Sequence, residues 1–288
     1  MLYRDFPGQD AIDAQYQTEL TVDDLTPYFE FYANNSAKAR DELECMLDIP
    51  FGPTVEETLD IFPGADPNGP IIVFVHGGYW RRLSAKEFSL VALGLVPRGA
   101  TVILTNYALC PKVTIPEITR QSRAAMAWIR NTGMSFPGDR ERIYALGHSA
   151  GGQQVVRMLQ TDWVNDYGLP ETTISGAMSF SGLFDLRPLR YSWLQPLLQL
   201  TVESVREESP IFSLPQAAPP LIALAGALET QEFHRQSADF IAAWNAAGLI
   251  GEYGLVANKN HFNVIDGLAD PDSALVDKVM DFIGGNAT

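Results

Sequence analysis

The sequence contains only two cysteines, Cys45 and Cys110, and only four histidines among its 288 residues. Two cysteines cannot form a disulfide framework, and no pair has the spacing of a metal site, so we expect no bound metal. Basic residues are also scarce, because 20 Lys and Arg stand against 35 Asp and Glu, a formal net charge of −15. Since a chain this acidic is not attracted to nucleic acid or to an anionic membrane, we expect neither as a partner.

Long apolar runs and targeting signals are missing as well. No apolar run approaches the roughly 18 residues that a membrane span needs. The first stretch, MLYRDFPGQDAIDAQ, lacks the basic start and apolar core of a signal peptide, so we expect a cytoplasmic protein. There is no G-x-G-x-x-G after the first strand and no Walker loop, which disfavours a cofactor enzyme, and we expect no cofactor.

What the sequence does contain, from about residue 55 onward, is an alternation of short apolar runs and helical patterns. The apolar runs are of the buried-strand type and cover 57–62, 71–75, 101–107, 142–147, 174–180, 220–226 and 251–257. The helical patterns cover 84–99, 115–133, 150–163, 232–248 and 272–285. Strands that are apolar throughout predict an α/β fold with a mainly parallel central sheet and helices on both faces.

Two segments stand outside this alternation. Residues 1–50 are polar and aromatic, with helical spacing over 25–47, and residues 183–215 are longer than a simple crossover helix. Because ligands bind at the carboxyl ends of the strands in such sheets, we expect the two segments to cover that end and shape a pocket. We therefore predict one domain over 1–288, with 1–50 as an N-terminal cover and 183–215 as a cap-like insertion.

The stretch RIYALGHSAGG, residues 142–152, matches the G-x-S-x-G nucleophile elbow, in which a strand turns sharply into a helix. The serine is Ser149, and side chains two residues before and after it would collide, which accounts for Gly147 and Gly151. The helix N-terminus also favours developing negative charge beside the serine. The alternative interpretation is a glycine-rich turn with an incidental serine.

A serine hydroxyl needs a neighbouring base, usually a histidine. The candidates are His76, His148, His234 and His261. Where such an elbow is used, the acid and then the base follow the serine in the chain, which leaves His234 and His261. His234 falls inside a helical pattern, whereas His261 lies in a loop after the last strand, so we predict His261 as the base. An ordinary loop histidine is the alternative.

The acid should follow the preceding strand. Glu229 lies a few residues past the end of that strand, where it could orient the imidazole of His261 and stabilise its charged form. Glu232 is the competitor, although a carboxylate at a helix start needs no catalytic role. Asp185 and Asp266 are weaker candidates by position, and Asp266 follows the base.

The stretch VHGGYW after the strand at 71–75 predicts the second half of an oxyanion hole. Glycines let backbone N–H groups turn toward a carbonyl oxygen without hindrance. We predict Gly77 and Gly78 as donors together with the N–H of Ala150, and the N–H of Tyr79 stays open as a further donor. His76 is expected to support this loop by hydrogen bonding.

Aromatic residues near these motifs are candidates for the substrate pocket. Tyr79 and Trp80 would flank the oxyanion hole as its wall, although Trp80 could equally pack in the core. The full set of substrate-binding candidates is Tyr79, Trp80, His148, Tyr191, Trp193 and Phe262.

Taken in order, HGGYW, NYALCP, GHSAGG, GALETQEFHRQS and NKNHFNVIDGLADP resemble the kynurenine formamidase (arylformamidase)-like branch of the α/β-hydrolase esterases. The resemblance runs from about residue 55 to the end of the sequence. It implies an α/β-hydrolase fold and a cytoplasmic serine hydrolase of tryptophan catabolism. Its substrates would be N-formylkynurenine or related aryl formamides and esters, without a cofactor. It also supports Ser149, Glu229 and His261 as the catalytic triad.

Other functions use the same residues and stay open. They are a broad-range carboxylesterase, another amidase, lactonase or carbamate hydrolase of a catabolic pathway, and a non-catalytic binding protein on a hydrolase scaffold. The sequence does not determine the oligomeric state, and a homodimer is one option.

Overall fold

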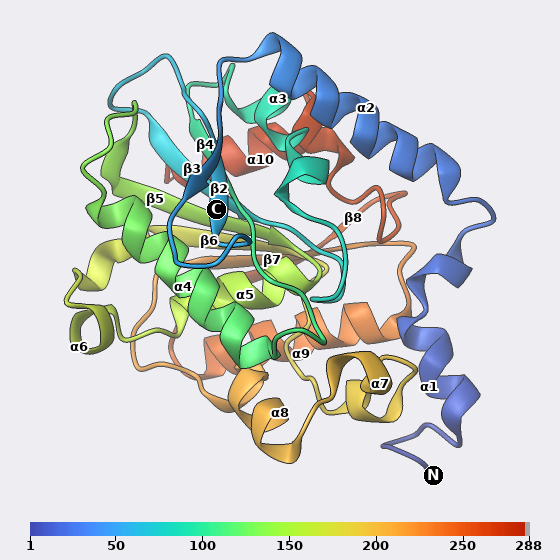
Figure 1. The fold of residues 1–288 in the computed structure, drawn as a ribbon. Coiled ribbons are helices and arrows are strands. Elements are labelled where there is room, and N and C mark those ends of the chain that lie inside the picture. The colour runs from blue at the N-terminus through green and yellow to red at the C-terminus, as the bar shows by residue number, and fades with distance from the viewer. Residues whose placement is uncertain (286–288) are drawn as a thin grey trace.

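The computed structural model describes residues 1–285, in which eight strands form one sheet in the order β1-β2-β4-β3-β5-β6-β7-β8 (Figure 1). The strands are β1 Met46–Pro50, β2 Thr58–Phe62, β3 Pro70–Val75, β4 Thr101–Thr105, β5 Asp139–His148, β6 Gly176–Phe180, β7 Leu221–Gly226 and β8 Gly251–Val256. Strands β3 to β8 pair in parallel, and antiparallel pairing is confined to β1–β2 and β2–β4. The predicted mainly parallel sheet is therefore confirmed.

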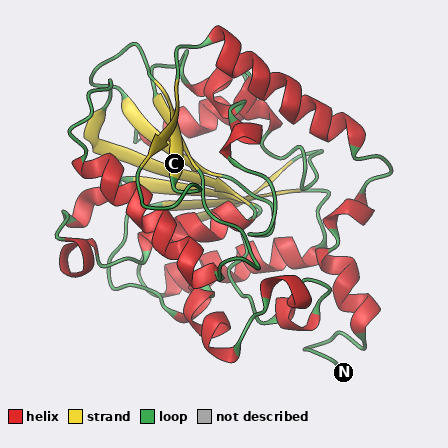
Figure 2. Cartoon of the chain, in the orientation of Figure 1, coloured by secondary structure: helices red, strands yellow, loops and turns green. Residues whose placement is uncertain are grey.

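Helices cover both faces of the sheet, as Figures 1 and 2 show. One face carries α1 Gln9–Tyr16, α4 Ile115–Asn131, α5 Ala150–Leu159 and α9 Gln231–Ala246, and the other carries α2 Thr26–Glu42, α3 Val91–Leu95 and α10 Ala274–Ile283. The apolar run of β3 explains this arrangement. Ile71, Val73 and Val75 enter the core of the first face, while Ile72 and Phe74 enter that of the second. Alternate side chains of a strand point to opposite faces, so a strand covered on both sides must be apolar throughout.

Three local features differ from the sequence prediction. The helix expected over 84–99 is a 3₁₀ turn, Ala85–Phe88, followed by the short helix α3; a capping box between Ser84 and Glu87 starts the turn. The helix expected over 150–163 ends at Leu159, and α6, Trp163–Tyr167, begins separately. The helical pattern 25–47 ends at Glu42 and gives way to β1, an irregularly paired edge strand that has no continuous apolar run.

The segment 183–215 forms short helices, α7 Gln195–Leu198 and α8 Val202–Glu208, with 3₁₀ turns on either side. It packs on α4, α9 and α1, so it lies on the flank of the helical layer (Figure 1). The N-terminal segment passes from α1 on that flank to α2 on the opposite side of the sheet (Figure 1). Within residues 1–285, no helix has the length and apolar character needed to span a membrane.

Candidate active site

The turn between β5 and α5 places Ser149 in a strained conformation. Its backbone has φ +55° and ψ −116°, a region that non-glycine residues rarely occupy. Its N–H donates to the Phe180 carbonyl at 2.7 Å, which ties the turn to the end of the neighbouring strand β6. Strain of this kind persists only when the surrounding structure imposes it, and it is frequent at functional sites.

The glycines around Ser149 are required by close backbone approach. A Cβ at Gly147 would lie 2.4 Å from the Gly151 carbonyl oxygen, and a Cβ at Gly151 would lie 2.0 Å from the Val75 carbonyl oxygen. The collision predicted from the sequence is therefore present, and Gly151 is also pressed against β3. Larger residues at these positions would push the turn apart.

Three buried side chains form a continuous hydrogen-bonded chain. Ser149 Oγ lies 3.1 Å from His261 Nε2, and His261 Nδ1 lies 2.7 Å from Glu229 Oε2. His261 comes from the loop after β8, and Glu229 lies three residues beyond the end of β7. With the proton on Nδ1, the imidazole donates to Glu229 and accepts from the serine hydroxyl, which is the arrangement that activates a serine nucleophile.

The second carboxylate oxygen of Glu229 is also occupied. It accepts hydrogen bonds from the Ser181 hydroxyl and, at 2.6 Å, from the N–H of Gly226. These donors fix the orientation of the carboxylate. Sequence reasoning missed Ser181, although its place at the end of β6, beside the end of β7, could have suggested it.

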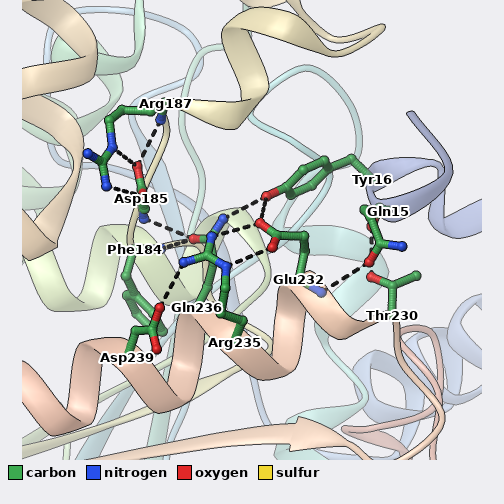
Figure 3. A network of polar contacts seen from close by, with 10 residues as sticks. All are labelled: Gln15, Tyr16, Phe184, Asp185, Arg187, Thr230, Glu232, Arg235, Gln236 and Asp239. Atoms are coloured by element: carbon green, nitrogen blue, oxygen red, sulfur yellow. Dashed lines mark hydrogen bonds and ion pairs between the residues drawn. The ribbon is translucent and has the colours of Figure 1, made fainter. Parts of the chain in front are cut away.

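The competing carboxylates have other partners. Glu232 accepts from the Tyr16 hydroxyl at 2.6 Å and pairs with Arg235 at 2.7 Å, which fastens the N-terminal segment to α9 (Figure 3). Asp185 pairs with Arg187 at 2.8 Å (Figure 3). Both carboxylates therefore have structural partners.

Asp266 is mostly buried, and among residues 1–285 its Oδ1 has no hydrogen-bond partner. Burial raises its pKa from an ordinary value near 3.8 to about 6. The native state therefore binds more protons than the unfolded state between about pH 4 and pH 6, so this group lowers stability as the pH rises through that window.

We expect Asp266→Asn to raise the melting temperature relative to the original protein at pH 8, because the buried charge is then absent. The difference should shrink as the pH falls toward 4, where the carboxyl is protonated in the native state and carries no buried charge. Thermal unfolding followed by circular dichroism at both pH values would measure it, with the exposed Asp272→Asn as the matched control. A difference that does not change with pH would contradict the assignment.

The other histidines serve as supports. His76 is buried and stacked on Tyr107, with ring centroids 4.0 Å apart, and its Nδ1–H donates to the Gly77 carbonyl at 2.7 Å. Burial lowers the pKa of His76 to about 4, so its ring is neutral near neutral pH. His234 Nε2–H donates to the carbonyl of Gly226, the last residue of β7, at 2.8 Å.

His148 contacts the loop that carries His261, with its Nε2 lying 2.9 Å from the His261 carbonyl oxygen. Burial, and then the neighbouring His261, hold the pKa of His148 well below its usual range. A neutral His148 can donate one hydrogen bond to this carbonyl without adding a positive charge beside the base.

A cavity of about 240 Å³ opens onto Ser149 and His261. Its wall is mainly aromatic and comprises Tyr28, Phe29, Tyr32, Tyr79, Phe88 and Phe262, with Thr18, Ala33, Gly78, Arg82, Leu83, Glu87 and His148 between them. The N-terminal segment supplies part of this wall, as the sequence predicts. The segment 183–215 supplies none of it, contrary to the expectation of a cap, because it packs on the helical flank.

The predicted pocket residues divide into two groups. Tyr79, His148 and Phe262 line the cavity, whereas Trp80, Trp193 and Tyr191 do not. Trp80 is fully buried, and its Nε1–H donates to Gln153 at 3.1 Å, so it belongs to the core. Trp193 makes an edge-to-face contact with Tyr79 and lies beneath the Arg81 guanidinium. Tyr191 stacks on Tyr3 near the surface.

The glycine loop after β3 lies against the serine turn. A Cβ added to Gly77 would be 3.2 Å from the Cβ of Ser149. Gly78 has φ +115°, a conformation that favours glycine, and Tyr79 follows with φ +50°. Ala150 is the first residue of α5, where backbone N–H groups have no partner within the helix. Both segments therefore bring backbone N–H groups to the site of Ser149.

No group of three or more His, Cys, Asp or Glu side chains converges on a possible metal position within residues 1–285.

The sheet order, the serine turn after β5 and the solved structures that resemble this one define an α/β-hydrolase. A candidate thioesterase from Silicibacter sp. TM1040 is 29% identical, with a TM-score of 0.82 over 94% of this chain and 98% of the other. Esterase 2 from Thermogutta terrifontis is 19% identical, with a TM-score of 0.67 over 85% of this chain and 96% of the other.

The BD-FAE family model matches residues 59–243, and the chain belongs to this family. It is 27% identical to the kynurenine formamidase of Danio rerio, over 96% of this chain and 97% of the relative. It is also 27% identical to Esterase LipQ of Mycobacterium tuberculosis, over 82% of this chain and 61% of the relative. The chain is therefore a kynurenine formamidase-like esterase of the α/β-hydrolase class, an enzyme that hydrolyses ester or amide bonds.

Proposed function

We propose that this protein is a serine hydrolase that cleaves small acyl compounds through an acyl-enzyme, with aryl formamides such as N-formylkynurenine as its substrates. One observation carries the proposal: the chain of hydrogen bonds from Ser149 through His261 to Glu229 opens on an aromatic cavity of about 240 Å³. We further propose that it acts in the cytoplasm, in tryptophan catabolism.

In the proposed mechanism, Ser149 Oγ attacks the acyl carbon while His261 Nε2 takes the hydroxyl proton. The negative oxygen of the tetrahedral intermediate accepts hydrogen bonds from the N–H groups of Gly77, Gly78 and Ala150. His261 then gives its proton to the leaving amine or alcohol, and the acyl group stays on the serine. Water, deprotonated by the same imidazole, attacks the acyl-enzyme, and the acid leaves as Ser149 recovers its proton.

Glu229 acts through the imidazole in this scheme. It holds Nδ1–H, so that Nε2 faces the serine, and it stabilises the imidazolium that forms during attack. The anchoring of its other oxygen by Ser181 and Gly226 keeps this orientation fixed.

The cavity supports a small aromatic substrate. Its volume lies below the roughly 300–1,000 Å³ of pockets for drug-sized ligands, and rings of the wall can pack on an aryl group. An aryl amine is a better leaving group than an alkyl amine, so a site of the esterase type could release it from a formamide. The similarity to a kynurenine formamidase over nearly the whole chain agrees with this substrate class.

A broad-range carboxylesterase is the second candidate, favoured by the similarity to Esterase LipQ. We expect kcat/KM for N-formylkynurenine to exceed that for p-nitrophenyl acetate by about 100-fold or more, which corresponds to about 2.7 kcal/mol of differential transition-state binding. Steady-state kinetics on both substrates would measure the ratio. Turnover of the ester alone would reject the formamidase function and favour the carboxylesterase.

A further inference from the structure

Arg82 lies on the same tight loop as the proposed oxyanion donors. The N–H groups of Arg81 and Arg82 both donate to the Gly78 carbonyl at 3.1 Å, which folds the loop back after the glycines. The turn is so close that a Cβ on Gly78 would lie 2.1 Å from the Arg82 carbonyl oxygen. Arg82 is one of the residues that line the cavity opening on Ser149. Its position is therefore set by the same backbone that forms the site.

Arg82 is the one Lys or Arg among the described residues that line this cavity. Its Nη2 donates to Glu19 at 2.5 Å, while its Nε is buried and has no hydrogen-bond partner within residues 1–285. A guanidinium has five N–H donors, so the ion pair with Glu19 leaves several of them available. A cation with free donors on a mainly aromatic wall suits a ligand that has an aromatic body and an anionic group.

Two carboxylates, one paired with Arg82 and one in the cavity wall, reduce the net positive charge of this part of the site. Glu19 is the direct partner of Arg82, and Glu87 lines the cavity, where its Oε2 accepts from the N–H and the hydroxyl of Ser84 at 2.8 Å each. The site thus combines one cation, Arg82, with two carboxylates, Glu19 and Glu87. Such a pattern can hold an anionic group at the arginine and tolerate a nearby ammonium.

We propose that Arg82 is a specificity-determining residue that binds a carboxylate on the leaving-group side of the substrate. The proposal rests on the proposed function and names its substrate class as carboxylate-bearing aryl formamides or esters. In N-formylkynurenine, the carboxylate would be that of the amino-acid end. The alternative is a structural role, a structural tie in which the ion pair between Arg82 and Glu19 holds the N-terminal segment in place.

The test compares Arg82→Met with Glu19→Gln, because both changes break the same ion pair but only the first removes the cation. N-formylkynurenine and its decarboxylated analogue serve as one substrate pair. An aryl acetate with a ring carboxylate and its methyl ester serve as a second pair. In each pair, we divide kcat/KM for the carboxylate-bearing substrate by kcat/KM for the carboxylate-free one. For Arg82→Met, we expect this ratio to fall by about 10- to 100-fold, mainly through a higher KM for the carboxylate-bearing substrate. For Glu19→Gln the ratio should stay level or rise.

Equal losses in both variants on all four substrates would overturn the proposal and make Arg82 a structural tie. An unchanged ratio in Arg82→Met would overturn it as well. The ester pair separates this test from the proposed function. If the original protein turns over neither formamide, but Arg82→Met still lowers the preference for the carboxylated ester, the formamidase function fails and the role of Arg82 stands.

Discussion

Ser149→Ala is expected to lower kcat on the order of 10⁴-fold or more on every substrate of this enzyme, because the acyl-enzyme can no longer form. The residual rate would come from the backbone N–H groups and from substrate binding. The fold should persist, since the serine hydroxyl contacts His261 at the cavity surface and the turn is held by the backbone N–H of the same residue. Initial rates and circular dichroism on both proteins would measure the two effects.

Ser179→Ala is the matched control for this change. Ser179 is buried on β6, directly beside Gly147 of β5, and among residues 1–285 its hydroxyl has no hydrogen-bond partner. It therefore tests the loss of a buried serine hydroxyl next to the site without touching the proposed nucleophile. A Ser149→Ala protein that keeps activity within about tenfold of the original would reject Ser149 as the nucleophile.

Glu229→Gln is expected to lower kcat by about 10²- to 10⁴-fold. Within residues 1–285, every hydrogen bond to the Glu229 carboxylate comes from a donor: His261 Nδ1–H on one oxygen, and Ser181 with the Gly226 N–H on the other. A glutamine must place its own NH₂ against one of these donors. Either the imidazole adopts the wrong tautomer, or the buried side chain loses its anchor, and in both cases the imidazolium loses its counter-charge.

Glu232→Gln is the control, because it changes the neighbouring carboxylate in the same way. Glu232 holds Tyr16 and Arg235, so its replacement should lower the melting temperature while changing kcat much less than Glu229→Gln does (Figure 3). Comparing kcat of Glu229→Gln with kcat of Glu232→Gln decides which of the two carboxylates is the catalytic acid. A larger loss of kcat in Glu232→Gln than in Glu229→Gln would make Glu232 the acid.

Much of the central sheet could be predicted from the sequence because its signals are local. The run 71–75 is apolar on both faces, and the glycines around Ser149 report a steric demand that a few adjacent residues create. The chain order of serine, acid and histidine then selected Glu229 and His261, and the structure brings these side chains within hydrogen-bond distance. The order of motifs along the chain can therefore predict contacts between residues that lie far apart in the sequence.

The cavity wall depends on long-range packing and could not be predicted in the same way. Trp80 follows the glycine loop directly, yet it turns into the core to reach Gln153 on α5. Tyr28, from the N-terminal segment, lines the cavity and accepts a hydrogen bond from Asn260, the residue before His261, at 2.8 Å. No spacing within either segment encodes these contacts. The edge strand β1 was missed for a related reason. Its sequence has no continuous apolar run, and its place in the sheet depends on pairing with β2.

The central claim is that Ser149 is the nucleophile, activated by His261. The most direct measurement is reaction of the protein with a fluorophosphonate, followed by intact mass and peptide mapping. We predict one adduct per chain, located on Ser149, that appears in parallel with loss of activity and is absent from Ser149→Ala. An active protein that forms no adduct, or one whose inactivating adduct lies on another residue, would contradict the claim.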